Sequence, residues 1–239
     1  MQNELLLGSR AAALREVLRA LEIDAATRAF LDGFMPDIPG VRPFVPAGAG
    51  HTDHLLRALA AAGAGFSIAT LADLQLLPSL GVDPRAVLYR NTAKRPADVR
   101  AAALRGVWRF AIDSERELQT IAGAAPGASV YVYVAVSGAG AGDPGASAQE
   151  SLRLLRMAPE LGLRPYGLAF HVGAAPADPP VYARAIDRCG LVMRRLEQLG
   201  TRIEMFAIGG GVGAPDSESV VPAAIGRLPY DPPLLVAEP

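Results

Sequence analysis

The stretch AVLYRNTAKRPADVRAAALRGVWRFAIDSERELQTIAGAA, residues 86–125, contains the same pattern twice. A β-rich apolar run at 86–90 precedes a segment with 3.6-residue apolar periodicity at 97–105, and a second run at 108–112 precedes a second such segment at 114–125. Gly106 follows the first periodic segment, where a helix favours a left-handed residue, and Ser114 places a short oxygen side chain where the second helix should begin. Strict alternation of strand and helix predicts a parallel sheet covered by helices.

The same alternation extends over most of the chain, and eight strands in about 200 residues fit a (β/α)8 TIM barrel better than an open doubly wound sheet. We predict an α/β fold with a single barrel domain over residues 41–239, preceded by an N-terminal helical segment, 1–40, that packs on the barrel. No helix follows the last run, and we expect an N-terminal helix to cover that side. The predicted strands are 43–48, 65–69, 86–90, 108–112, 129–136, 165–172, 203–208 and 233–237. The predicted helices are 10–21, 25–34, 53–62, 71–80, 97–105, 114–125, 149–161, 181–199 and, more weakly, 217–226.

The composition excludes several classes of protein. The chain has 23 basic and 24 acidic residues and a net charge of −1, so we expect no nucleic-acid partner and no binding to an anionic membrane. No apolar run is long enough to span a bilayer, and the first residues do not form a secretion signal, so we expect a cytoplasmic protein. The only cysteine, Cys189, excludes an internal disulfide. His51 and His54 could share a helix face, but no third ligand accompanies them, and we expect no metal.

One count is more informative than the others. Of the 23 basic residues, only Lys94 is a lysine. Any chemistry that requires a lysine amine therefore has one candidate side chain among these 239 residues.

In a barrel of this kind the functional side chains lie at the carboxyl ends of the strands. The glycine-rich run AIGGGVG, residues 207–213, follows the seventh predicted strand, where its N–H groups could hold a phosphate; a plain tight turn is the alternative. His171 follows the sixth strand and could stack on a flat ligand or move a proton, or it could be a partly buried side chain bonded to a carbonyl. Glu238 ends the eighth strand and would point its carboxylate into the mouth of the barrel.

Other polar residues have simpler interpretations. Tyr131 and Tyr133 alternate with valines on the fifth predicted strand, which favours core packing, with Tyr133 nearer the ligand end. Asp73 and Asp113 are expected to cap helices or to face solvent. Cys189 is interpreted as a small buried hydrophobic residue.

Several stretches, in this order and spacing, resemble the barrel domain of the pyridoxal-phosphate (PLP) decarboxylases that act on ornithine, diaminopimelate and arginine, which share the fold of alanine racemase. The resemblance covers about residues 41–238 and implies a PLP-binding barrel whose ancestral activity is that of an amino-acid decarboxylase, a lyase. The stretches are LLRALAAAGAGFSIATLADLQLLPSLGVDP, KRPADVRAA, FAIDSERELQTIA, LGLRPYGLAFHVGAA, FAIGGGVG and VAEP.

The resemblance also implies positions for functional residues, and several of these differ. In the family, a lysine at the end of the first strand forms the Schiff base with PLP, and the matching position is Gly48, within VPAGAG at 45–50. The residues found at the other altered positions are Ser67 for an acidic residue, Asp73 for a glutamate, Tyr133 for an arginine, Ala174 for a serine and Ala207 for an aspartate.

Other family positions are retained. His171 matches the histidine that stacks on the pyridine ring, and Glu238 matches the glutamate that pairs with the pyridinium nitrogen. The phosphate-binding glycines are matched by Gly209, Gly210 and Gly211. The chain ends before the family's next Gly-Arg and without its C-terminal β-domain, so we expect a homodimer, or a heterodimer with a related decarboxylase-like chain.

Three hypotheses follow. The first is a degenerate homologue without lysine–PLP chemistry, either a non-catalytic or regulatory subunit or a repurposed biosynthetic barrel. The second is a non-PLP enzyme that uses His171 as acid or base on a small anionic intermediate, with Glu238 or Tyr133 assisting. The third is a PLP decarboxylase anchored through Lys94, which otherwise is an ordinary loop lysine, or completed by a separate chain that supplies the β-domain. The catalytic candidates are thus His171, Glu238 and Lys94, and the sequence does not specify a substrate.

Overall fold

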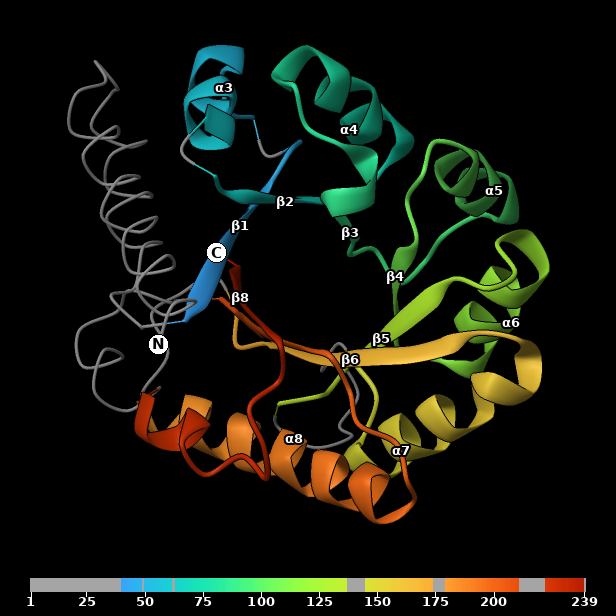
Figure 1. The fold of residues 1–239 in the computed structure, drawn as a ribbon, viewed down its shortest axis with the longest axis vertical. Helices are drawn as coiled ribbons and strands as arrows, with labels where there is room; N and C mark the ends of the chain where they lie inside the picture. The colour runs from blue at the N-terminus through green and yellow to red at the C-terminus, as the bar shows by residue number, and fades with distance from the viewer. Residues whose placement is uncertain are drawn as a thin grey trace.

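The computed structural model describes residues 40–48, 50–61, 63–136, 145–173, 179–210 and 222–238. Eight parallel strands close into a barrel in the order of the sequence, and β8 pairs with β1 to complete it (Figure 1). The strands are β1 Val41–Pro46, β2 Gly65–Ile68, β3 Leu88–Tyr89, β4 Arg109–Ile112, β5 Ser129–Tyr133, β6 Arg164–His171, β7 Met205–Gly209 and β8 Leu234–Glu238. The predicted (β/α)8 barrel is therefore confirmed.

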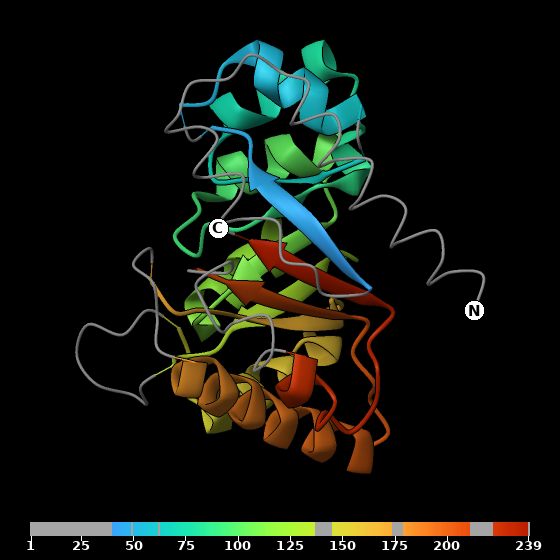
Figure 2. The ribbon, with the colours of Figure 1, turned by 90° about the vertical axis from the view of Figure 1, so that its left-hand side faces the viewer.

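Helices surround the strands on the outside, as the two views at right angles show (Figures 1 and 2). Within the described ranges, none of the helices combines the length and the apolar character that a membrane crossing requires. The α-helices are α3 Asp53–Ala61, α4 Leu71–Leu76, α5 Pro96–Leu104, α6 Glu115–Ala124, α7 Ala148–Met157 and α8 Pro179–Gln198. Short 3-10 helices occur at η1 Leu77–Leu80, η2 Pro84–Ala86 and η3 Pro159–Leu161.

The element boundaries differ from the predicted ones where proline or a competing hydrogen bond intervenes. The predicted helix 71–80 changes from α to 3-10 at Leu77, because Pro78 has no N–H to continue the α-helical ladder. The fifth strand ends at Tyr133 because Ala135 donates to the Ala146 carbonyl at 2.8 Å, and Ala146 donates back to the Tyr133 carbonyl at 2.8 Å. The chain there is bound to the segment that leads into α7.

Some predicted segments lie outside the described residues. These are the N-terminal helices 10–21 and 25–34 and the first part of 217–226, of which residues 222–225 are helical. The packing of an N-terminal helix on the barrel therefore stays a prediction.

The core has two layers that follow from the strand alternation. One layer fills the space between the barrel and its helices, and Tyr89, Ile112 and Phe170 belong to it. The other fills the inside of the barrel. The inner residues are Phe44, Leu88, Ala111, Tyr131, Tyr166, Ala169, Met205, Ala207 and Val236. The strands are thus buried on both faces, as a parallel barrel requires.

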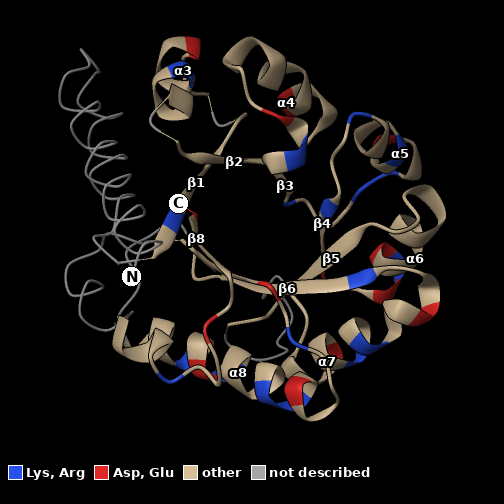
Figure 3. Ribbon diagram, viewed as in Figure 1, with Lys and Arg blue, Asp and Glu red and all other residues tan. Residues whose placement is uncertain are grey.

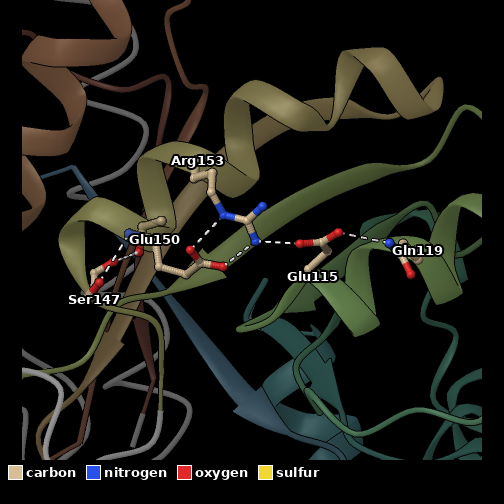
Figure 4. A network of polar contacts seen from close by, with 6 residues as sticks. Glu115, Gln119, Ser147, Glu150 and Arg153 are labelled. Atoms are coloured by element: carbon tan, nitrogen blue, oxygen red, sulfur yellow. Dashed lines mark hydrogen bonds and ion pairs between the residues drawn. The ribbon is translucent and has the colours of Figure 1, made fainter.

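Charged residues lie mainly on the outer helices, where both signs are mixed on α6, α7 and α8 (Figure 3). One network joins two of these helices, with Arg153 of α7 contacting Glu150 and reaching Glu115 at the start of α6 (Figure 4). Both ion pairs have N···O distances of 2.7 Å and are about half-exposed, so water and salt screen them.

Candidate site at the mouth of the barrel

The inner face of the barrel becomes polar at the carboxyl ends of the strands. Two residues beyond the apolar residues that fill the barrel, the same face continues with Arg90, Asp113, Tyr133, His171 and Glu238. A cavity of about 410 Å3 opens at this end of the barrel. It is lined by Ala69, Arg90, Asn91, Thr92, Asp113, Tyr133, Gly145 and His171.

Glu238 has one used and one unused carboxylate oxygen. The side chain belongs to a residue that is only 4% exposed, and its Oε2 accepts a hydrogen bond from the Tyr133 hydroxyl at 3.1 Å. Oε1 is buried and has no partner among the described residues. Burial and the charge of Glu238 raise the pKa of Tyr133 well above its usual value, so this phenol stays protonated and donates.

Tyr131 lies one layer deeper in the barrel. Its hydroxyl is buried and has no partner among the described residues. Its ring lies 6.0 Å from that of Tyr133, and burial raises its pKa well above the usual value. A buried donor without an acceptor is uncommon, and it marks the upper part of the barrel as a place with unsatisfied polar groups.

His171 packs against the glycine run that follows β7. A Cβ atom on Gly209 would come within 2.8 Å of His171 Cδ2, and one on Gly210 within 2.9 Å of Cε1, so the ring needs glycine at both positions. Nδ1 of His171 accepts a hydrogen bond from the Gly173 N–H at 3.0 Å, which leaves Nε2 to carry the proton in the neutral ring. The structure thus brings together His171, Gly209 and Gly210.

The backbone of Gly210 is already engaged. Its N–H donates to the Glu238 carbonyl at 3.0 Å, and its carbonyl accepts from the buried Tyr182 hydroxyl at 2.7 Å. Gly210 is therefore held as a tight turn, and its N–H does not point freely at an anion. Gly211, the third predicted phosphate-binding glycine, and Ala174 lie outside the described residues.

Gly48 faces the carboxylate of Asp73. A Cβ atom at position 48 would lie 2.1 Å from Asp73 Oδ1, which is a clash. Asp73 cannot easily move away, because its Oδ2 accepts from the N–H groups of Ala69 at 2.7 Å and Thr70 at 3.0 Å. Together with the bond from the Asp73 N–H to the Thr70 hydroxyl, these contacts form a capping box at the start of α4. Asp73 caps a helix, as the sequence suggested.

Lys94 is not among the residues that line the mouth cavity. Its side chain is 0% exposed, and its ammonium donates to the carbonyls of Asn91 at 2.5 Å and Ala111 at 2.7 Å. It also forms an ion pair with Glu117 Oε2 at 2.7 Å, while Glu117 Oε1 accepts the Lys94 backbone N–H at 3.0 Å. Burial lowers the Lys94 pKa and the Glu117 charge opposes that shift. The ammonium thus makes two hydrogen bonds and one ion pair.

Two residues that line the mouth cavity were not predicted from the sequence to belong to the site. Asp113 was expected to cap a helix or face solvent, but the cap position of α6 is Ser114 and Asp113 lines the cavity. Arg90 was assigned no function. The signal that could have found it is the alternation of β3, in which Leu88 points inward, Tyr89 outward and Arg90 inward again.

Within the described part of the chain, no group of three or more His, Cys, Asp or Glu side chains lies close enough to hold a metal ion. Burial lowers the pKa of His51.

The sequence of this chain matches a protein-family model and several characterised proteins. A family model described as pyridoxal-dependent decarboxylase, pyridoxal binding domain, matches residues 22–227. The lysine/ornithine decarboxylase of Selenomonas ruminantium is 34% identical over 192 residues, which are 77% of this chain and 48% of that protein. Antizyme inhibitor 2 of Xenopus laevis is 30% identical over 191 residues, 77% of this chain and 42% of that protein.

The chain is also similar to solved structures. A lysine decarboxylase structure from Selenomonas ruminantium superposes with a TM-score of 0.76 and 26% identity, and the match covers 95% of this chain and 60% of that one. The chain spans less than half the length of the two curated relatives. These matches confirm the resemblance inferred from the sequence, and the chain belongs to the family of pyridoxal-dependent decarboxylases, in which it matches the pyridoxal binding domain.

Proposed function

We propose that this barrel is a degenerate member of its family, without Schiff-base chemistry between a lysine and PLP, and that it acts as a non-catalytic or regulatory subunit. The observation that carries the proposal is the approach of Asp73 to Gly48, where the family resemblance places the lysine. A side chain at position 48 would start with its Cβ atom 2.1 Å from the Asp73 carboxylate. The carboxylate that caps α4 therefore occupies the space that the Cβ atom of a lysine at position 48 would need.

The single lysine of the chain gives the second support. Lys94 is fully buried and its ammonium is bound by Glu117 and two backbone carbonyls. A Schiff base requires a neutral amine that can reach the cofactor, and forming one here would leave the Glu117 carboxylate buried without its partner. This favours a structural role for Lys94 over the hypothesis that it anchors PLP.

The mouth fits PLP in part. When bound, this cofactor supplies an electron sink for carbanions. Glu238, with its unpartnered oxygen, and His171 are suited to hold a pyridine ring, and the cavity of about 410 Å3 has room for one. These residues do not fit the covalent attachment of PLP, because position 48 has no lysine and Lys94 does not line the cavity. One matched relative is named for inhibiting antizyme and not for decarboxylation, which is consistent with a non-catalytic member.

The test is to mix the purified protein with PLP, record the visible absorbance of an internal aldimine, reduce with borohydride and map adducts by mass spectrometry. We expect no aldimine band and no reduced adduct on Lys94. A band together with an adduct on Lys94 would overturn the proposal and support the PLP-decarboxylase hypothesis. An adduct on the N-terminal amine is scored separately.

A matched pair of variants tests the carrying observation directly. We expect Gly48→Lys to form no aldimine, because the Asp73 carboxylate obstructs the new side chain, and Gly48→Lys/Asp73→Gly to form one. Equal aldimine formation by both variants would show that Asp73 is no obstacle.

A second candidate function is a non-PLP enzyme, and what favours it is that His171 lines the cavity together with Tyr133, the hydrogen-bond donor to Glu238. Here His171 would act as acid or base on a small intermediate. A pH profile that changes in His171→Gln, with the fold intact, would support it over the regulatory proposal. Dimerisation, with a second copy or a related chain, stays a prediction that light scattering on the purified protein can check.

A further inference from the structure

Arg90 is a half-buried cation at the mouth of the barrel. Leu88 packs inside the barrel, and Tyr89 packs outside it with its ring 5.8 Å from that of Phe110. The next residue, Arg90, therefore faces the interior and lies nearer the mouth, where it lines the cavity. Its Nε is buried and has no hydrogen-bond partner among the described residues.

Glu238 has a hydrogen-bond acceptor that lacks a donor among the described residues. Its Oε1 is buried without a partner among the described residues, in a residue that is only 4% exposed. Tyr133 connects the two groups, because it lines the cavity together with Arg90 and its hydroxyl donates to Glu238 Oε2 at 3.1 Å. The Arg90 Nε donor and the Glu238 Oε1 acceptor, neither of which has a partner among the described residues, thus lie in the same polar region of the barrel mouth.

The chemistry of these groups restricts the ligand. A guanidinium binds a carboxylate through two parallel charge-assisted hydrogen bonds, whereas Glu238 Oε1 can only accept. Asp113 lines the same cavity as Arg90, and Glu238 is hydrogen-bonded to Tyr133 of that lining, so two carboxylates accompany one guanidinium in this region. A dianion such as phosphate meets repulsion from both acids, and a monoanion that also carries a hydrogen-bond donor does not.

We propose that the mouth binds a small monocarboxylate whose carboxylate ion-pairs with Arg90 and whose O–H or N–H group donates to Glu238. Such a ligand would give hydrogen-bond partners to both the Arg90 guanidinium and Glu238 Oε1. Its binding does not require PLP. The inference rests on the proposed function in one respect, because the cavity must be free of PLP to accept this ligand.

The test uses three acids of matched size. Lactate brings an O–H donor, alanine an ammonium donor, and propionate no donor at this position. Binding is measured by calorimetry and thermal shift at constant ionic strength, on full-length protein whose spectrum shows that it is free of PLP. We expect lactate or alanine to bind more tightly than propionate, and phosphate to bind no better than chloride. Which of the first two binds better distinguishes a hydroxy acid from an amino acid as the natural source.

Variants assign the two ends of the ligand. Arg90→Gln should weaken binding by about tenfold to a hundredfold, the loss typical of a charge-assisted hydrogen bond. Glu238→Gln should remove the advantage of alanine over propionate. Arg95→Gln is the matched control, because Arg95 is an exposed arginine paired with Asp98 at 2.8 Å on the outside, and binding should not change.

Four results would overturn the proposal: no binding of any of the three acids, equal affinity in Arg90→Gln, equal affinity of all three acids, or preferred binding of phosphate. If Arg90→Gln does not fold, Arg90→Lys replaces it, with an expected loss in the same direction because the ammonium cannot bind in the same bidentate way. Aldimine formation with PLP is scored in a separate experiment, so failure of the proposed function and failure of this inference are distinguishable.

Discussion

Two cationic side chains follow strand β3, four positions apart, and they have opposite surroundings. Lys94 is fully buried and its ammonium meets a carboxylate and two carbonyls. Arg90 is half-buried, lines the cavity, and has a buried Nε without a partner among the described residues. A buried charge with all its partners stabilises the fold, and a charge that lacks them is available to a ligand. The same loop therefore carries one residue with a structural environment and one to which we assign ligand binding in the proposal above.

The largest effect is expected from removing the structural cation. Lys94→Met leaves Glu117 buried without its counter-ion, and we expect it to lower the free energy of unfolding by about 3–5 kcal/mol. Urea denaturation measures the loss. The double variant Lys94→Met/Glu117→Met should regain most of it, because the uncompensated charge is gone. A loss below about 1 kcal/mol in the single variant would contradict the structural role and make Lys94 comparable to Arg90.

A smaller loss is expected at the position opposite Asp73. Gly48→Ala places a Cβ atom 2.1 Å from Asp73 Oδ1, so the capping carboxylate must shift. We expect a loss of about 1–2 kcal/mol, the size of a helix N-cap contribution. In an Asp73→Ala background the cap is already lost, so adding Gly48→Ala should cost much less. Additive losses in this double-mutant cycle would show that the two residues do not interact.

The tyrosines at the mouth predict a pH dependence. Their pKa values are raised in the folded protein, so above about pH 10 the unfolded chain releases protons that the folded chain retains. The protonated tyrosines therefore contribute to the free energy of unfolding below the pKa of the unfolded tyrosine, and this contribution is lost as the pH rises from there through the raised pKa of the folded protein. Tyr131→Phe should flatten the alkaline loss and, because it removes an unsatisfied hydroxyl, raise stability at neutral pH by up to about 1 kcal/mol. An unchanged alkaline profile in Tyr131→Phe would contradict this.

The smallest changes in the free energy of unfolding are expected for arginines that contribute little to stability. Arg90→Met should change the free energy of unfolding by less than about 1 kcal/mol, in the stabilising direction, because it removes a half-buried charge whose Nε has no partner among the described residues. Arg153→Ala, which breaks the exposed network of Figure 4, should give no measurable change because solvent screens its ion pairs. A large loss in Arg90→Met would mean that Arg90 belongs to the structural class of Lys94.

Much of the architecture could be predicted from local patterns. The apolar runs and helical periodicity placed all eight strands, and the strand ends pointed to His171 and Glu238 as residues of the mouth. The errors in the boundaries have local causes, such as Pro78 changing the helix type after Leu76. The capping role of Asp73 was also predictable, because it depends on residues within one helical turn.

What the sequence determined by itself is the alternation of buried and exposed positions, and hence the barrel and the ring of strand ends, because neighbours in sequence decide these features. It also determined that a single lysine is present and that glycine stands at position 48. Only the tertiary structure decided that Lys94 meets Glu117, that the Asp73 carboxylate fills the space in front of Gly48, and that the Arg90 Nε has no hydrogen-bond partner among the described residues. Those outcomes depend on contacts between strands and helices about 20 or more residues apart, and on which buried charges find a counter-ion when the barrel closes.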